Sequence, residues 1–104
     1  MTKKHCINWS ELPEQLSSSQ VGKRALNGDN ALLVMVRVPA GTRAPRHTHP
    51  HAQFVQVLSS SGLLETEQGS HPFGPGSVFH FPAETWHAAV FDSETVLIET
   101  NLNH

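Results

Sequence analysis

Disulfide bonds are the first feature that this chain lacks. Cys6 is the only cysteine among 104 residues, so no internal disulfide can form. The start of the chain, "MTKKHCINW", has two lysines with no apolar stretch behind them, so we expect no secretory signal. A reducing, cytoplasmic location is the expectation, because small extracellular domains commonly depend on disulfides.

Long apolar runs and clusters of basic charge are also missing. Apolar runs such as residues 31–36 are far too short to span a bilayer, so no membrane association is expected. Seven basic residues are scattered along the chain and the net charge is −2, which excludes nucleic acid as an expected partner. With 38% hydrophobic residues at this length, residues 1–104 are predicted to form a single domain.

Turn residues, by contrast, recur about every 8–12 positions and separate short runs rich in Val, Phe and Leu. These runs predict strands at 31–38, 53–58, 63–68, 77–81, 87–91 and 95–100, and Gly28 suggests a hairpin that pairs 21–26 with 31–38. An N-terminal arm of about residues 1–20, with one helical turn capped by Ser10, precedes a barrel of about residues 21–101. The fold class is therefore all-β, a sandwich or a barrel.

The strand predicted at 31–38 shows no clean alternation of apolar and polar residues. Both of its faces are therefore expected to be covered. Closure of a barrel would cover one face, and a second subunit would cover the other. On this ground a homodimer is expected.

Histidine is the residue that this chain has in excess, with eight copies. The stretch "HTHPHAQ", which ends at Gln53, has three histidines and a glutamine at alternate positions. Alternate residues of a strand share a face, so His47 and His49 project together and are placed to bind one metal ion. Because Pro50 interrupts the strand, the residues alone leave open whether His51 or Gln53 is the third donor.

Two segments of the chain match the two motifs of the cupins. The segment from Gly41 to Gln53 resembles the first motif, which is a glycine, five residues, His-x-His, three or four residues and a glutamate. The segment from Gly76 to His87 resembles the second motif, which is a glycine, five residues, Pro-x-Gly, two residues and a histidine. Gln53 replaces the usual glutamate, and Glu84 replaces a turn glycine. The resemblance implies a small jelly-roll barrel over most of the chain.

By this resemblance, one divalent transition metal (Ni, Fe, Mn, Zn or Co) would be bound by His47, His49, Gln53 and His87. The alternative is a cupin that has lost its metal and keeps the histidines as a polar pocket floor. A neutral amide in place of a carboxylate leaves the ion its full charge. The ion would then be a stronger Lewis acid toward a carbonyl or carboxylate, and less suited to stabilising Fe(III).

Cupins with this glutamine resemble, most nearly, the small pectin- and alginate-degradation cupins that act on 4,5-unsaturated monouronates. Those proteins carry an acidic residue, an aromatic residue and then an arginine in and after the last strand. Glu99 can occupy the acidic position, but the residues that follow it include neither an aromatic residue nor an arginine. Glu99 is the candidate general acid or base. Arg43, with Arg37 and Arg46 as alternatives, is the candidate for pairing with a substrate carboxylate.

The function predicted from these residues is Lewis-acid catalysis by a metal-dependent isomerase, tautomerase or lyase. Its substrate would be a small anionic sugar acid or keto acid. A non-catalytic module that binds metal or a small ligand is the first alternative, and a metal-dependent dioxygenase is the second. His80, between Phe79 and Phe81, is expected either in the core or lining the pocket.

Overall fold

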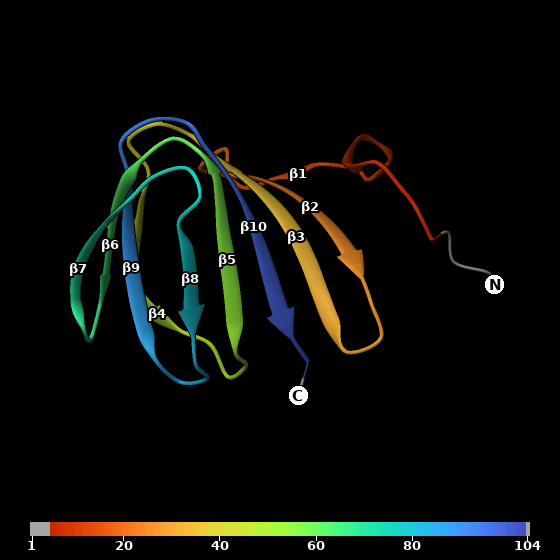
Figure 1. Cartoon of the computed structure of the whole chain (residues 1–104). Helices are drawn as coiled ribbons and strands as arrows, with labels where there is room; N and C mark the ends of the chain where they lie inside the picture. The colour runs from red at the N-terminus through yellow and green to blue at the C-terminus, as the bar shows by residue number, and fades with distance from the viewer. Residues whose placement is uncertain (1–4, 104) are drawn as a thin grey trace.

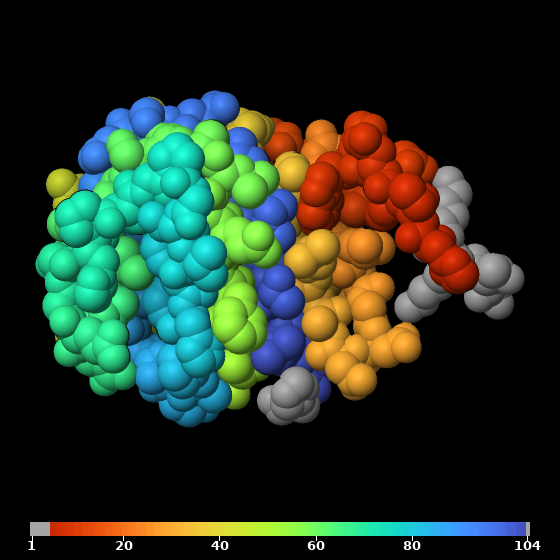
Figure 2. Space-filling model, viewed as in Figure 1, coloured from red at the N-terminus to blue at the C-terminus, as the bar shows by residue number. Residues whose placement is uncertain are grey.

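The computed structural model describes residues 5–103, which form two antiparallel sheets that face each other (Figure 1). In order across the first sheet, the strands are β1 (Gln15–Leu16), β2 (Gly22–Asn27), β3 (Ala31–Val38), β10 (Thr95–Leu102), β5 (Gln53–Ser59) and β8 (Val78–Phe81). The second sheet contains β4 (Arg43–Thr48), β9 (Trp86–Phe91), β6 (Gly62–Thr66) and β7 (Gly69–Phe73). The β2–β3 hairpin and the N-terminal arm extend to one side of the barrel (Figure 2).

The predicted all-β fold class is confirmed, and each of the six predicted strands ends within two residues of its expected bounds. The hairpin of β2 and β3 is also present, closed by a hydrogen bond from the Gly28 amide to the Ala31 carbonyl (2.8 Å). β4 and β7 were not among the predicted strands. Their sequences explain this, because β4 is mostly polar and β7 contains Pro72, so neither shows an apolar strand pattern.

The N-terminal arm contains a three-residue 3₁₀ helix, Trp9–Glu11. The prediction of Ser10 as its cap is wrong, because Asn8 occupies the cap position. The side chain of Asn8 accepts a hydrogen bond from the Ser10 amide (2.9 Å), and Glu11 accepts one from the Asn8 amide (2.7 Å). In the described part of the chain, no helix has the length and apolar character that crossing a membrane requires.

β3 alternates in the structure although its sequence does not. Val34, Val36 and Val38 are buried, whereas the residues between them are half-buried on the opposite face. The N-terminal arm reaches that opposite face, where Arg37 donates a hydrogen bond to Glu14 (3.0 Å). The N-terminal arm therefore covers part of the outer face of β3, and this explains in part why that face carries apolar residues.

The core lies between the two sheets and draws side chains from seven strands. Aromatic rings meet edge to face there, with the Phe73 centroid 5.4 Å from that of Phe79 and 5.7 Å from that of Phe91. The buried apolar residues are Val34, Val36, Val38, Val55, Val57, Leu64, Phe73, Phe81, Phe91 and Leu97.

The outer face of β5 and β8 exposes large apolar side chains. Phe54, Leu58 and Val78 are 40%, 50% and 65% exposed, and they alternate with buried core residues. His80 lies on the same face, stacked on Phe54 at 4.8 Å. The expectation that His80 lies in the core or the pocket is therefore wrong, because it has the parity of Val78. The homodimer stays a prediction, for which this face is available and which light scattering can test.

The turn before β9 holds a non-glycine residue in the left-handed region. Glu84, which stands where the cupin motif has glycine, has a φ of 68°, and its amide donates to the carbonyl of His49 (2.8 Å). A side chain at this φ costs about 1 kcal/mol or more, since Cβ crowds the neighbouring carbonyl. The hydrogen bond ties the turn that precedes His87 to the segment that carries His49.

Replacement of Glu84 by glycine is predicted to stabilise the fold. Glu84→Gly should raise the free energy of unfolding by up to about 1 kcal/mol, because glycine adopts this φ without the Cβ penalty. Ala83→Gly is the matched control and should lower it by about 0.4–1 kcal/mol, since the φ of Ala83 is not positive. Urea denaturation measures both values, and equal destabilisation by the two changes would contradict the prediction.

Candidate metal centre

Three histidines meet at one end of the barrel, close to the turn described above. His47 of β4 lies directly opposite His87 of β9 in the strand register, and His49 follows β4 by one residue. One ring nitrogen from each of the three lies within 4.8 Å of the other two. Ligand bonds of about 2.0–2.1 Å require nitrogens closer together than 4.8 Å, so side-chain rotations would have to bring the three nitrogens around one ion.

The surroundings keep the imidazoles of His87 and His49 neutral. The side chain of His87 is only 7% exposed, and its burial, with smaller contributions from His47 and His49, lowers its pKa to about 4. Burial also lowers the pKa of His49, followed by the charges of His47, His51 and Lys23. A neutral imidazole retains the lone pair that a metal ligand needs.

The hydrogen bonding of the histidines fits a divalent metal. The Nδ1 of His47 lies 2.7 Å from the carbonyl oxygen of Pro45, which can only accept, so Nδ1 carries the proton and Nε2 keeps its lone pair. The Nδ1 of His87 is buried without any hydrogen-bond partner among the described residues. Such an unpaired polar atom is costly, and one bond to an ion or to a bound molecule would remove that cost. The cluster of His47, His49 and His87 could therefore hold one divalent metal ion.

Gln53, and not His51, lies in the cavity beside the histidines. Gln53 is 4% exposed and lines the cavity together with His47 and His87. Its Nε2 donates a hydrogen bond to the Oδ1 of Asn101 (2.7 Å), its cross-strand partner on β10. This hydrogen bond occupies the amide nitrogen and leaves Oε1, the oxygen of the side chain, available as a metal ligand. His51 is half-buried, with its ring 5.3 Å from that of His49, and is not among the cavity-lining residues.

Glu99 also lines this cavity, from the middle of β10. It lies two residues before Asn101, so the two side chains share the inner face. Burial raises the pKa of the Glu99 carboxyl, while the charge of Lys23 and a hydrogen bond from Asn101 oppose this shift. The cavity therefore contains a carboxyl group that can change protonation state closer to neutral pH than an exposed glutamate.

The arginines predicted to meet a substrate do not line the cavity. Arg43 is exposed at the start of β4, Arg46 lies over the ring of Trp86 at 3.8 Å, and Arg37 is bound to Glu14 on the outer face. Sequence reasoning missed Lys23 of β2, which does line the cavity. The hairpin register pairs Lys23 with Val36, and that pairing was the signal that could have found it.

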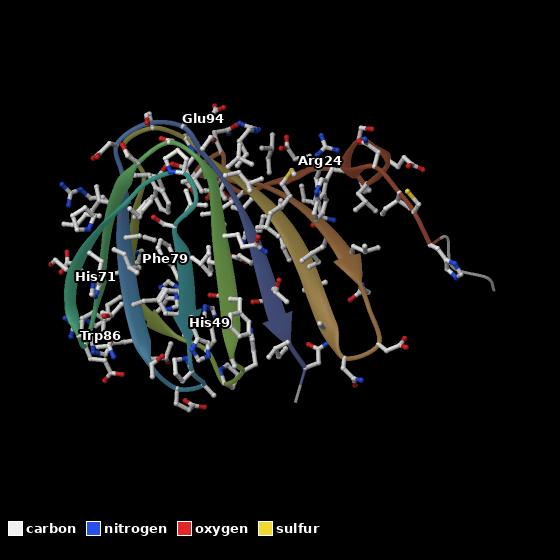
Figure 3. The ribbon with its side chains drawn as sticks, in the orientation of Figure 1. Arg24, His49, His71, Phe79, Trp86 and Glu94 are labelled. Atoms are coloured by element: carbon white, nitrogen blue, oxygen red, sulfur yellow. The ribbon has the colours of Figure 1, made fainter. Side chains whose placement is uncertain are left out.

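The cavity runs between the sheets from the histidines toward the opposite end of the barrel. Its volume is about 210 Å³. Gln53 and Phe81 pair in register at the histidine end, whereas Val38 and Thr95 pair at the other end. Figure 3 shows His49 near the lower end of β5 and β8 and Phe79 higher up. A ligand that enters at the histidines thus meets an increasingly apolar interior.

An antiparallel barrel with three histidines at one end of its interior defines a class of small β-barrel proteins that can hold a divalent metal. The sequence model of the cupin domain matches residues 34–100. The chain belongs to the cupin family.

Solved structures with the same fold have low sequence identity to this chain. An RmlC-like cupin from Shewanella frigidimarina has a TM-score of 0.88 and 17% identity, and the match covers 98% of this chain and 93% of that one. KdgF from Halomonas sp. has a TM-score of 0.82 and 21% identity, with 91% of each chain covered. A cupin-superfamily sugar phosphate isomerase from Silicibacter pomeroyi has a TM-score of 0.80 and 18% identity, with 95% and 76% covered. No curated protein matches the sequence.

The His87 imidazole is predicted to stay neutral far below the usual pKa of histidine. In metal-free protein, an NMR titration should give His87 a pKa of about 4, because burial disfavours the imidazolium ion. Between pH 6.5 and about 4 the unfolded chain then binds more protons at this residue than the folded chain. Its contribution to the free energy of unfolding should therefore fall as the pH is lowered through that range. A His87 pKa at or above 6.5 would show that the buried, neutral site is wrong.

Proposed function

We propose that this cupin is a metal-dependent enzyme that uses Lewis-acid chemistry on a small organic acid, as an isomerase, tautomerase or lyase. The observation that carries the proposal is that the half-buried carboxyl group of Glu99 lines the same cavity as His47 and His87 of the histidine cluster. A metal-binding module alone needs the donors but has no use for a carboxyl group whose pKa is raised by burial.

The proposed ligands are His47, His49, His87 and the Oε1 of Gln53. All four are neutral, so a bound Ni, Fe, Mn, Zn or Co ion would keep its full charge and polarise a carbonyl or carboxylate oxygen of the substrate. The register pair of Gln53 with Asn101 supports this set, because the hydrogen bond to Asn101 fixes which end of the amide is free.

Glu99 is proposed to move the proton. In its ionised form it can remove a proton next to the polarised carbonyl, and in its protonated form it can return one to a neighbouring carbon or oxygen. Asn101 orders this carboxyl by donating a hydrogen bond to it, while accepting one from Gln53. The apolar walls of the barrel exclude water, which strengthens the electrostatic interactions inside the cavity.

The similar solved structures support the proposal only at the level of the fold. Their identities of 17–21% to this chain do not transfer an activity. One of these structures is a sugar phosphate isomerase, which is consistent with the proposal.

Metal content and turnover, measured on the same variants, test the proposed function. Wild type loaded with each candidate metal should hold about one equivalent, and His49→Ala and His87→Ala should lose it, because each removes one of the proposed ligands. Turnover is followed as exchange of the α-hydrogens of 2-oxo acids and uronates with deuterated solvent. Glu99→Gln should keep the metal and lose about 10²–10⁴-fold in exchange rate, as expected for loss of a general base.

The outcomes separate the enzyme from its alternative. Full exchange activity in Glu99→Gln would remove Glu99 from the mechanism. A wild type that binds metal but exchanges no substrate would support the non-catalytic binding module. Retention of metal by both histidine variants would show that the ligand set is wrong.

Asn101 is predicted to influence metal affinity through Gln53. Asn101→Leu removes the acceptor that orients the amide and should weaken metal binding about 10–100-fold, as is typical when a partner of a ligand is lost. Asn101→Asp is the matched control and should keep or tighten binding, since a carboxylate still accepts from the Gln53 nitrogen. Competition with a chelator measures both. An equal loss for Asn101→Leu in a Gln53→Ala background would show that Asn101 does not act through Gln53.

A further inference from the structure

The described part of the chain contains five basic residues other than histidine, and one of them lines the cavity. That residue is Lys23 of β2. Arg24 donates hydrogen bonds to the backbone carbonyls of Trp9 and Leu12, and the other three arginines lie outside the cavity, as described above. Lys23 is exposed at the edge of the cavity, and an anionic group that enters the barrel meets it as the single cationic side chain of the described lining apart from the metal site.

Lys23 lies near both Glu99 and the histidine cluster, at the level of Val36 and Leu97 in the strand register. Its charge lowers the pKa of both Glu99 and His49, so the ammonium group is within electrostatic reach of the two side chains. Within residues 5–103 it forms neither an ion pair nor a hydrogen bond. A lysine that lines the cavity and has no partner among these residues is available to a ligand.

The walls beyond these charged groups offer almost no hydrogen bonds. Apart from Lys23, Glu99 and the proposed metal ligands, Thr42 is the only polar side chain on the lining, and its hydroxyl already donates to the carbonyl of Pro39 (2.7 Å). A hydroxyl group that leaves water for an apolar wall without a new partner is strongly disfavoured. The apolar lining consists of Val21, Val36, Val38, Ala44, Val55, Leu64, Phe79, Phe81, Ala89, Phe91 and Leu97.

The size of the cavity limits the ligand. A volume of about 210 Å³ is below the ~300–1,000 Å³ typical of pockets for drug-sized molecules. It equals the liquid volume of about seven water molecules. The space between the sheets thus suits a short hydrocarbon group, while Lys23 and Glu99 also line an adjoining hollow of about 320 Å³.

We propose that the substrate is a small monocarboxylic acid with a short apolar tail, a keto acid rather than a polyhydroxylated sugar acid. Its carboxylate pairs with Lys23, its remaining oxygen faces the histidine cluster and its tail packs against the apolar walls. This inference rests on the proposed function for the location of the site. It assigns to Lys23 the role in anion recognition that the sequence suggested for Arg43.

Equilibrium binding to the metal-loaded protein tests the inference without requiring turnover. The probes are pyruvate, 2-oxobutanoate and 2-oxopentanoate on one side, and glucuronate and galacturonate on the other, titrated by calorimetry. Affinity should rise about fourfold with each added methylene of the 2-oxo acids, because each one is buried against the walls. The two uronates should bind at least tenfold more weakly than 2-oxopentanoate.

Two variants separate the candidate cations. Lys23→Gln should weaken every 2-oxo acid by about tenfold or more, since a charge-assisted hydrogen bond is lost. Lys23→Arg should restore most of that affinity. Arg43→Gln should leave it unchanged, because Arg43 lies outside the cavity. A loss in Arg43→Gln without a loss in Lys23→Gln would overturn the assignment.

The remaining outcomes distinguish this inference from the proposed function. Uronates that bind more tightly than the 2-oxo acids, no increase along the 2-oxo acid series, or no binding of any probe would overturn the inference. Turnover of a uronate that depends on Glu99 would also overturn it, while leaving the proposed function intact. The predicted binding pattern without any turnover would support the inference and reject the enzyme.

Discussion

The pairing of β4 with β9 is the constraint on which the site depends. It places His47 opposite His87, although forty residues of chain separate them, and so brings the two cupin motifs together. A second contact supports the first, because the amide of Glu84 holds the carbonyl of His49 and links the turn before His87 to the segment after β4. A slip of one residue in this register would turn His87 to the outer face.

Burial inside the barrel stabilises the fold and also shifts the pKa values of the groups that line the cavity. It lowers the pKa of His87 and raises that of Glu99, so imidazole is favoured in its neutral form and carboxyl in its protonated form. Phe81 contributes directly, because its ring stacks on that of His87 with the centroids 3.8 Å apart. The side chains that pack the core near Phe81 therefore also set the pKa of His87. A substitution there should change both the stability of the core and this pKa.

Alternation and turn spacing, which depend on local geometry, predicted the fold class, six of the strands and the shared face of His47 and His49. The addition of His87 to the cluster came from the resemblance to the second cupin motif, because its pairing with His47 is long-range. Parity could not choose between His51 and Gln53, since Pro50 interrupts the strand and the choice depends on Asn101, which is distant in sequence. His80 was misplaced because its aromatic neighbours suggested burial, while its parity matches exposed Val78. Lys23 was missed because a lysine in a strand is ordinarily exposed, as Lys23 is, and its place beside the cavity follows from the hairpin register.

The proposed substrate contact at Lys23 was hard to predict for a related reason. The pairing of its strand decides whether a charged side chain lines the cavity. The three candidate arginines were predicted from their positions near the first motif, which carry no information about β2. The hairpin register that pairs Lys23 with Val36 is what places it on the inner face. The clustered histidines depend on few pairings and could be anticipated, whereas the proposed substrate contacts depend on the whole barrel.

We propose that three histidines and Gln53 bind one metal ion in this protein. X-ray absorption of the metal-loaded protein tests it most directly, because scattering through imidazole rings gives the number of histidine ligands. The account predicts three imidazoles and otherwise only oxygen ligands around the ion. Four imidazoles would show that His51 has taken the place of Gln53, and two or fewer would contradict the cluster itself.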